Sequence, residues 1–141
     1  MCMSKIKSIL IVDDDQNDQH IIARLFKRSF SFCPTYASSF PEARAKLSNQ
    51  QFDIVVLDGY LPDLLHGGYG YQLIPDVQKT QSSRCIILMI SGERIHIQKG
   101  LELCKNLEIA VHFGFSKSDI SKDVKLTEEF ELVPIQVIQR A

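Results

Sequence analysis

Short strand-like segments alternate with helix-like segments along the chain, and no other feature of the sequence constrains the fold as strongly. The strand-like segments are rich in β-branched and apolar residues and cover residues 8–12, 35–38, 52–57, 85–90 and 109–115. Those at 8–12, 52–57 and 85–90 are almost continuously apolar, which is typical of strands that are covered on both faces. The order β-α-β-α-β-α-β-α-β therefore predicts an α/β fold, a doubly wound, five-stranded parallel sheet with helices on both faces.

Four helices are expected between these strands, at about 21–29, from 40 onwards, at 71–79 and at 94–106. Ser39 is expected to cap the second helix, because Glu42 follows it at the spacing of a capping box. Pro75 falls inside the third segment, where a proline is unfavourable because it lacks a backbone N–H.

The composition is that of an ordinary globular domain of 141 residues, with 45% apolar and 23% charged residues. Lys and Arg number 16 and Asp and Glu number 17, so no basic excess indicates binding to nucleic acid or to an anionic membrane. The longest apolar run, residues 86–90, is far shorter than the roughly 20 residues of a membrane span. With no export signal and four scattered cysteines, the chain is expected to be cytoplasmic, with its thiols reduced.

Polar residues stand directly after four of the predicted strands. They are Asp13, Asp14 and Asp15 after the first strand, Asp58 after the third, Ser91 after the fourth and Lys117 after the fifth. In an open parallel sheet the carboxyl ends of the strands meet at one edge, so these groups are expected to converge there. Crowded carboxylates favour a hard cation such as Mg²⁺, and a carboxylate can also accept a phosphoryl group to form an acyl phosphate. The phosphoryl oxygens would then face the cation, the Ser91 hydroxyl and the Lys117 ammonium.

Each of these features has a structural explanation when it is taken alone. An aspartate triplet after a strand is often a solvated turn or a helix N-cap, and a single lysine is often a surface charge. The four histidines and four cysteines show no spacing that is typical of a metal site or of a nucleophilic Cys–His pair. It is the arrangement of all the polar groups at successive strand ends that favours a functional site.

In these segments the sequence resembles the receiver domain of two-component response regulators. The matching residues are Ile-Val-Asp13-Asp14-Asp15, Val-Val-Leu-Asp58-Gly-Tyr-Leu-Pro62, Met-Ile-Ser91-Gly92 and Phe-Ser-Lys117. The resemblance implies a flavodoxin-like (βα)5 fold with Asp58 as the phosphoacceptor. It also implies a Mg²⁺ site made by Asp13, Asp14, Asp58 and the backbone carbonyl of Tyr60, with Ser91 and Lys117 contacting the phosphoryl group. The implied donor is a phosphohistidine on a histidine kinase or a histidine phosphotransfer protein, and the domain is expected to assist only its own phosphorylation and dephosphorylation.

The sequence departs from the family pattern near Lys117. The family usually follows this lysine with a proline and a cis peptide bond, whereas Ser118 follows here. A trans bond is expected, because a cis bond before a residue other than proline costs about 2.5–4 kcal/mol. The family also carries an aromatic residue three positions before the lysine, where this chain has Gly114. Either Phe113 or Phe115 substitutes for that residue, or the usual coupling between Ser91 and an aromatic side chain is lost.

The sequence leaves more than one function open. No output domain follows Lys117, so a stand-alone receiver that acts on a protein effector in trans is expected. The alternative is a phosphorylation-independent interaction module, built from the Lys117 loop, the additional residues 64–69 and the apolar tail. A phosphatase of the haloacid dehalogenase type is disfavoured, because its DxDx[TV] pattern is matched only in its two aspartates and leaves Asp58 without a role. Residues 1–122 are expected to form the domain, and 123–141 a closing helix or an atypical tail that packs on the same domain, on a partner or in a homodimer.

Overall fold

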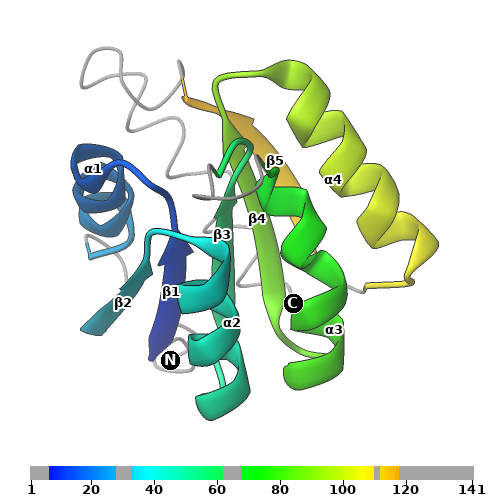
Figure 1. Cartoon of the computed structure of the whole chain (residues 1–141), viewed down its shortest axis with the longest axis horizontal. Coiled ribbons are helices and arrows are strands. Elements are labelled where there is room, and N and C mark those ends of the chain that lie inside the picture. Colours follow the sequence, from blue (N-terminus) through cyan, green and yellow to red (C-terminus); the bar gives the residue numbers. More distant parts are fainter. Residues whose placement is uncertain (1–6, 28–32, 62–67, 110–111, 118–141) are drawn as a thin grey trace.

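A five-stranded parallel sheet forms the centre of the protein, as Figure 1 shows for a computed structural model in which residues 7–27, 33–61, 68–109 and 112–117 are described. The strands are β1 (Ser8–Val12), β2 (Cys33–Ala37), β3 (Ile54–Asp58), β4 (Ile86–Ser91) and β5 (His112–Ser116). The helices are α1 (Gln16–Lys27), α2 (Phe40–Asn49), the 3-10 helix η2 (Gly70–Leu73), α3 (Ile74–Thr80) and α4 (Arg94–Asn106). The strand order is β2-β1-β3-β4-β5 and every neighbouring pair is parallel, which confirms the predicted α/β, doubly wound, flavodoxin-like architecture.

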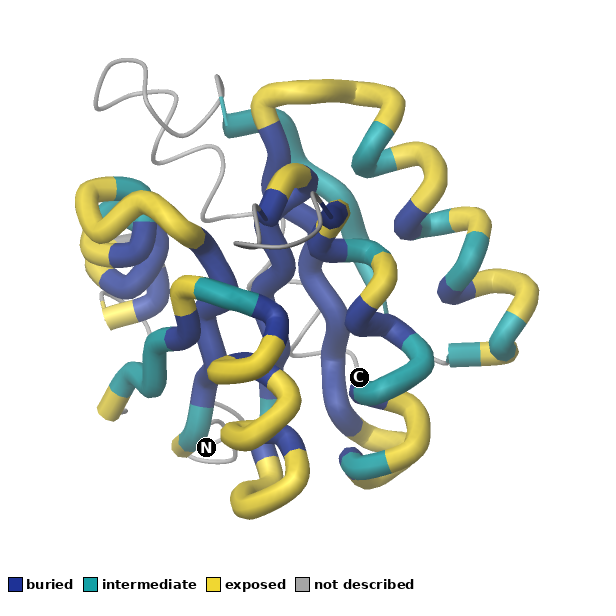
Figure 2. Tube along the Cα trace, viewed as in Figure 1, coloured by how far each residue is buried: buried dark blue, intermediate teal, exposed yellow. Residues whose placement is uncertain are grey.

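The sheet is covered on both faces, and alternate residues of each central strand belong to different cores. In β1, Leu10 and Val12 join the core under α2, α3 and α4, whereas Ile9 and Ile11 join the core under α1. Because side chains alternate across a strand, a strand that is buried on both faces must be apolar at every position. This explains the continuous apolar runs, and Figure 2 shows β1, β3 and β4 as mostly buried, the edge strands β2 and β5 as mostly intermediate and the outer helix surfaces as exposed.

Three of the predicted strands end one residue later than the sequence indicated, and the segment predicted at 109–115 becomes His112–Ser116. The segment predicted at 52–57 becomes Ile54–Asp58, and the segment predicted at 85–90 becomes Ile86–Ser91. Asp58 and Ser91 are thus the last residues of their strands instead of the first residues beyond them. The reason is that the backbone pairing of the sheet continues through both positions, with Asp58 opposite Ile90 and Ser91 opposite Ser116.

The helices begin where local chemistry satisfies their first amide groups. The Ser39 hydroxyl accepts a hydrogen bond from the Glu42 amide at 3.3 Å, which confirms the predicted cap of α2. Pro75 does not lie inside a single helix over 71–79, because η2 comes first and α3 begins at Ile74. The proline therefore stands in the first turn of α3, where its missing N–H is not required.

Some of the sequence-based expectations fall outside the described residues. These are the closing helix or tail at 123–141, the trans bond between Lys117 and Ser118, and most of the additional segment 64–69. Among the helices that the structure describes, none has the length and hydropathy needed to cross a membrane.

Gly114 allows α4 to pack closely against β5. A Cβ atom at this position would overlap the Cγ2 methyl of Ile97 and would lie 3.2 Å from Cδ1 of Leu101, both on α4. Phe113 and Phe115 point the other way, since both pack against the core under α1. Neither phenylalanine therefore takes the place of the aromatic residue expected near position 114, and the space beside Gly114 is occupied by Ile97.

We expect Gly114→Ala to destabilise the protein by about 1–3 kcal/mol, because the new methyl group overpacks the contact between α4 and β5. Urea unfolding followed by circular dichroism measures this loss. Gly92→Ala is the control, because a Cβ atom there has no neighbour within 4 Å. In an Ile97→Ala background the cost of Gly114→Ala should fall, and an unchanged cost in that background would contradict the packing argument.

Candidate functional site

The carboxyl ends of four strands meet at one edge of the sheet and bring together the polar residues singled out in the sequence. Asp13 directly follows β1, Asp58 ends β3, Ser91 ends β4 and Lys117 follows β5. These positions come from distant parts of the chain and become neighbours because β1, β3, β4 and β5 are adjacent and parallel. The predicted convergence at the sheet edge is therefore observed.

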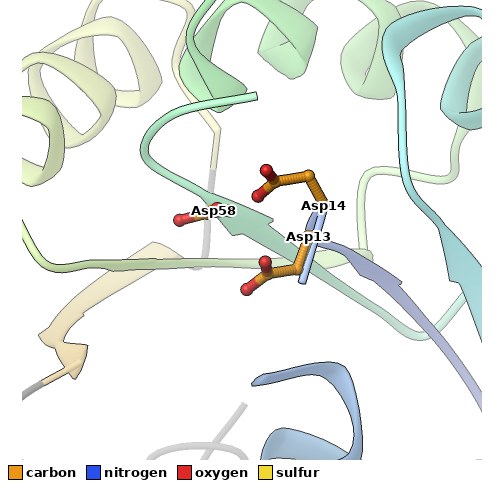
Figure 3. A group of neighbouring side chains, drawn as sticks. All are labelled: Asp13, Asp14 and Asp58. Atoms are coloured by element: carbon orange, nitrogen blue, oxygen red, sulfur yellow. The ribbon is translucent and has the colours of Figure 1, made fainter. Parts of the chain in front are cut away.

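Three carboxylates form the centre of this site. One oxygen atom from each of Asp13, Asp14 and Asp58 lies within 4.8 Å of the others, and Figure 3 shows the three side chains around one space beyond the strand ends. The side chains of Asp13 and Asp58 are only 1% and 7% exposed, whereas Asp14 is exposed. Two nearly buried negative charges and one exposed charge thus face a common volume.

Lys117 is the internal counter-ion of the site. Its Nζ lies 3.0 Å from Oδ1 of Asp58 and 3.1 Å from Oδ2 of Asp13. Its shortest contact, at 2.8 Å, is to Oδ2 of Asp18 on α1. Burial by itself lowers the pKa of Lys117, but the hydrogen bond to Asp18 and the charges of Asp58 and Asp13 outweigh burial and raise that pKa above its usual value. The lysine therefore stays charged at every physiological pH.

The Asp13 carboxylate is left incompletely satisfied by these contacts. Its Oδ1 accepts a hydrogen bond from the Asp15 amide at 3.0 Å. Its Oδ2 is buried and receives no hydrogen bond among the described residues, since the 3.1 Å ion pair with Lys117 lacks hydrogen-bond geometry. Burial and the nearby charge of Asp58 raise the pKa of Asp13 to about 7. Burial also raises the pKa of Asp58, and Lys117 offsets part of that rise.

This donor set fits a small divalent cation. Hard cations such as Mg²⁺ prefer carboxylate and carbonyl oxygens and keep several waters, so two or three carboxylates are enough to hold them. The buried Oδ2 of Asp13 pairs with Lys117 but accepts no hydrogen bond among the described residues, so it is available as a ligand, and a dication would offset the effects of burial and of the Asp58 charge that raise the pKa of Asp13. Tyr60, predicted to contribute its backbone carbonyl, stands two residues after Asp58 with its side chain 49% exposed, and its role stays a prediction.

Ser91 and Gly59 are packed against each other behind the carboxylates. The Ser91 side chain is buried, and its hydroxyl accepts a hydrogen bond from the Glu93 amide at 3.0 Å. A Cβ atom on Gly59 would overlap the Ser91 hydroxyl and would lie 2.9 Å from Cβ of His96. Gly59 is therefore needed for close approach of the chain, since no glycine in the described segments has a positive φ.

Gly70 also allows a close approach, in this case of η2 to the backbone of Asp58. A Cβ atom on Gly70 would overlap the backbone carbonyl oxygen of Asp58, so only glycine lets η2 start against the end of β3. The loop that joins the two is closed by hydrogen bonds from Leu61 N to Gly68 O at 2.9 Å and from Gly70 N to Gly59 O at 3.2 Å. The close approach of Gly70 to Asp58 thus depends on the absence of a side chain at position 70.

The loop from β1 to α1 is fixed by two residues outside the carboxylate cluster. The Asp15 carboxylate accepts hydrogen bonds from the amides of Asn17 at 2.8 Å and Asp18 at 3.2 Å, so the third aspartate of the triplet is the helix cap. The buried amide of Gln19 donates to the carbonyl of Asp13 and to the hydroxyl of Ser38. The triplet thus combines the two explanations considered for it, with Asp13 and Asp14 in the site and Asp15 as a cap.

The sequence analysis missed Asp18 as a partner of Lys117. An acidic residue in the first turn of a helix is already favoured by the helix dipole, so nothing in the local pattern indicated a long-range contact. The two residues are 99 positions apart in the chain. The available signal was the topology, which places the start of α1 beside the carboxyl end of the sheet.

We expect Asp13→Asn to stabilise the protein without divalent ions more at pH 8 than at pH 5. A carboxyl whose folded pKa is raised from 3.8 to about 7 contributes stability below pH 3.8 and loses it as the pH rises through 7. The pH-dependent difference should be about 2 kcal/mol, because one unit of pKa corresponds to about 1.4 kcal/mol. Urea unfolding in a chelating buffer measures it. Asp76→Asn, which removes an exposed carboxylate from α3, should change stability by less than ~0.5 kcal/mol, and equal gains for Asp13→Asn at both pH values would contradict the assignment.

Comparison with known proteins places this arrangement in a family. The model of the response regulator receiver domain matches residues 9–109. No curated protein matches the sequence significantly. Among solved structures, a CheY-like response regulator receiver domain from Methylobacillus flagellatus is 21% identical, with a TM-score of 0.65 and coverage of 94% of this chain and 98% of that chain. The non-phosphorylated HemR receiver domain from Leptospira biflexa is 21% identical, with a TM-score of 0.66 and coverage of 96% and 95%.

A third similar structure was solved with ligands. It is a response regulator protein from Burkholderia pseudomallei with a phosphorylated aspartic acid, a calcium ion and citrate, 15% identical, with a TM-score of 0.58 and coverage of 91% of this chain and 72% of that chain. Identities this low establish a shared fold, and the family match over residues 9–109 establishes more, because it spans most of the chain. The chain belongs to the response regulator receiver domain family.

Proposed function

We propose that this receiver, formed by residues 1–122, accepts a phosphoryl group on Asp58 and signals the change to a partner protein. The donor is a phosphohistidine on a histidine kinase or a histidine phosphotransfer protein. The observation that carries the proposal is the ion pair at 3.0 Å between Lys117 and Asp58, made beside the three-carboxylate cluster. A carboxylate with a fixed ammonium and a cation-binding cluster next to it has the surroundings that phosphoryl transfer requires.

The residues that would hold Mg²⁺ are Asp13, Asp14, Asp58 and the backbone carbonyl of Tyr60. When bound, the cation supplies neutralisation of charge on the phosphoryl oxygens. The buried Oδ2 of Asp13, which accepts no hydrogen bond among the described residues, supports this choice of ligands. The Burkholderia pseudomallei protein, which has a similar fold, was solved with a phosphorylated aspartic acid and a calcium ion, and this lends further support.

The protein's own groups account for the rest of the transfer. A carboxylate oxygen of Asp58 forms the new bond to phosphorus while the bond from phosphorus to the donor imidazole breaks, and the bonding electrons leave with the imidazole nitrogen. Lys117 pairs with the negative charge on the phosphoryl oxygens, and the Ser91 hydroxyl donates a hydrogen bond to one of them. To do so, Ser91 gives up its present role of accepting from the Glu93 amide or adds a second bond to it.

Intact-mass analysis after incubation with acetyl phosphate and Mg²⁺ tests the proposal. We expect the wild-type protein to gain one phosphoryl group, and we expect no gain for Asp58→Asn or without a divalent ion. Asp76→Asn, which removes a surface carboxylate that pairs with Arg44, is the matched control and should be phosphorylated like the wild type. Phosphorylation of Asp58→Asn, or no gain by the wild type with any phosphodonor, would contradict the proposal.

A second candidate function is a phosphorylation-independent interaction module. The observation that favours it is that Ile97 fills the space beside Gly114, so no aromatic side chain can move there when Asp58 changes state. Under the leading proposal, α4 itself must respond to phosphorylation, because Ser91 is joined to its start through Glu93.

Methyl resonances of Ile97 and Leu101 distinguish the two functions. We expect them to shift on phosphorylation of Asp58, because α4 follows Ser91 directly and packs on β5 through these side chains. Methyl NMR spectra of the protein with and without acetyl phosphate make the measurement, and Leu47, a buried residue of α2, is an internal reference. Complete phosphorylation with unchanged α4 resonances would instead support the constitutive module.

A further inference from the structure

Lys117 occupies part of the site in which the cation would bind. Two of its three carboxylate partners, Asp13 and Asp58, belong to the three-carboxylate cluster. An incoming divalent ion must therefore draw these carboxylates away from an ammonium group that already pairs with them. Cation binding is an exchange of partners for Lys117 and not the filling of a free site.

Among the partners of Lys117 in the described part of the chain, Asp18 is the one outside the cluster. It lies in the first turn of α1 and makes the shortest of the three contacts, at 2.8 Å. Its backbone amide is held by the Asp15 cap, so the carboxylate is presented from a fixed position at the edge of the site. The contact to Asp18 is a hydrogen bond, whereas the contact to Asp13 is an ion pair without hydrogen-bond geometry.

We propose that Asp18 is a positioning residue that retains Lys117 at the side of the site when a divalent cation takes Asp13 and Asp58. The Lys117 side chain is only 25% exposed, so an ammonium that lost every carboxylate would be poorly solvated and would face a dication. With Asp18 present, one charge-assisted hydrogen bond remains, and the ammonium stays directed at the oxygen that a phosphoryl group would use. This inference rests on the proposed function, in which Mg²⁺ binds at the cluster.

The test is the affinity for Mg²⁺, measured by isothermal titration calorimetry in the absence of any phosphodonor. We expect Asp18→Asn to weaken binding roughly tenfold, the low end of the effect of losing a hydrogen bond between charged groups, because the pair is partly exposed. The Asp18 side chain is 34% exposed at a helix surface, so asparagine is expected to be accepted there without loss of the fold. Thermal unfolding of each variant in a chelating buffer checks this.

Two controls separate positioning from a general effect of charge. Asp15→Asn removes one negative charge from the same loop but keeps a side chain that can cap α1, and we expect it to weaken Mg²⁺ binding less than twofold. In a Lys117→Gln background there is no ammonium to retain, so Asp18→Asn should then weaken binding no more than Asp15→Asn does. This dependence on Lys117 is what a direct ligand or a purely structural residue would not show.

Three outcomes of these titrations would contradict the inference. If wild-type protein binds Mg²⁺ and Asp18→Asn binds it equally well or more tightly, Asp18 has no positioning role. If Asp18→Asn weakens binding equally with Lys117 or Gln at position 117, Asp18 acts as a ligand or by charge alone, and the inference is again wrong. If wild-type protein does not bind Mg²⁺ at all, the cation site of the proposed function fails, and the inference fails with it.

Discussion

The burial of two carboxylates at the edge of a sheet is the constraint on which the rest of this structure depends. Asp13 and Asp58 lie where solvent cannot stabilise their charge, and a single ammonium group from β5 compensates for it. That ammonium joins the ends of β1, β3 and β5 to the start of α1 through Asp18. The compensation is incomplete, because Asp13 keeps an oxygen without a hydrogen bond and a raised pKa. The negative charge of the site is therefore only partly compensated by the protein's own groups in the described segments.

The close packing of the site and of α4 depends on three glycines, which have no side chain. Gly59 gives room to Ser91, Gly70 gives room to the carbonyl of Asp58, and Gly114 gives room to α4. None of the three has a positive φ, so close packing and not unusual backbone geometry explains why each is glycine. Around the end of β3 the backbone segments approach one another at distances that a methyl group would prevent. Gly114 likewise allows close packing on the face of the sheet that α4 covers.

Much of this could be predicted from the sequence, because buried parallel strands carry a strong apolar signal and their topology determines where strand ends meet. The pattern was sufficient to place Asp13, Asp58, Ser91 and Lys117 at one edge. It did not reveal Asp18, whose position in a first helical turn has a local explanation that conceals the contact with Lys117. The sequence left open whether Phe113 or Phe115 takes the place of an aromatic residue at position 114, and the structure shows why neither does. Neighbouring residues of a strand face opposite sides, so both phenylalanines lie on the face away from α4.

The two hydrogen bonds that close the loop after β3 have a consequence for how this protein can vary in length. Leu61 N and Gly68 O are joined at 2.9 Å, and Gly70 N and Gly59 O at 3.2 Å, so the base of the loop is held together independently of what lies between residues 61 and 68. Adding residues to a loop with a fixed base costs little chain entropy, since that cost grows only with the logarithm of loop length. Residues can therefore be added or removed between positions 61 and 68 without displacing Asp58, and this is the point at which an epitope or a fluorescent label can be inserted with the least effect on the carboxylate cluster.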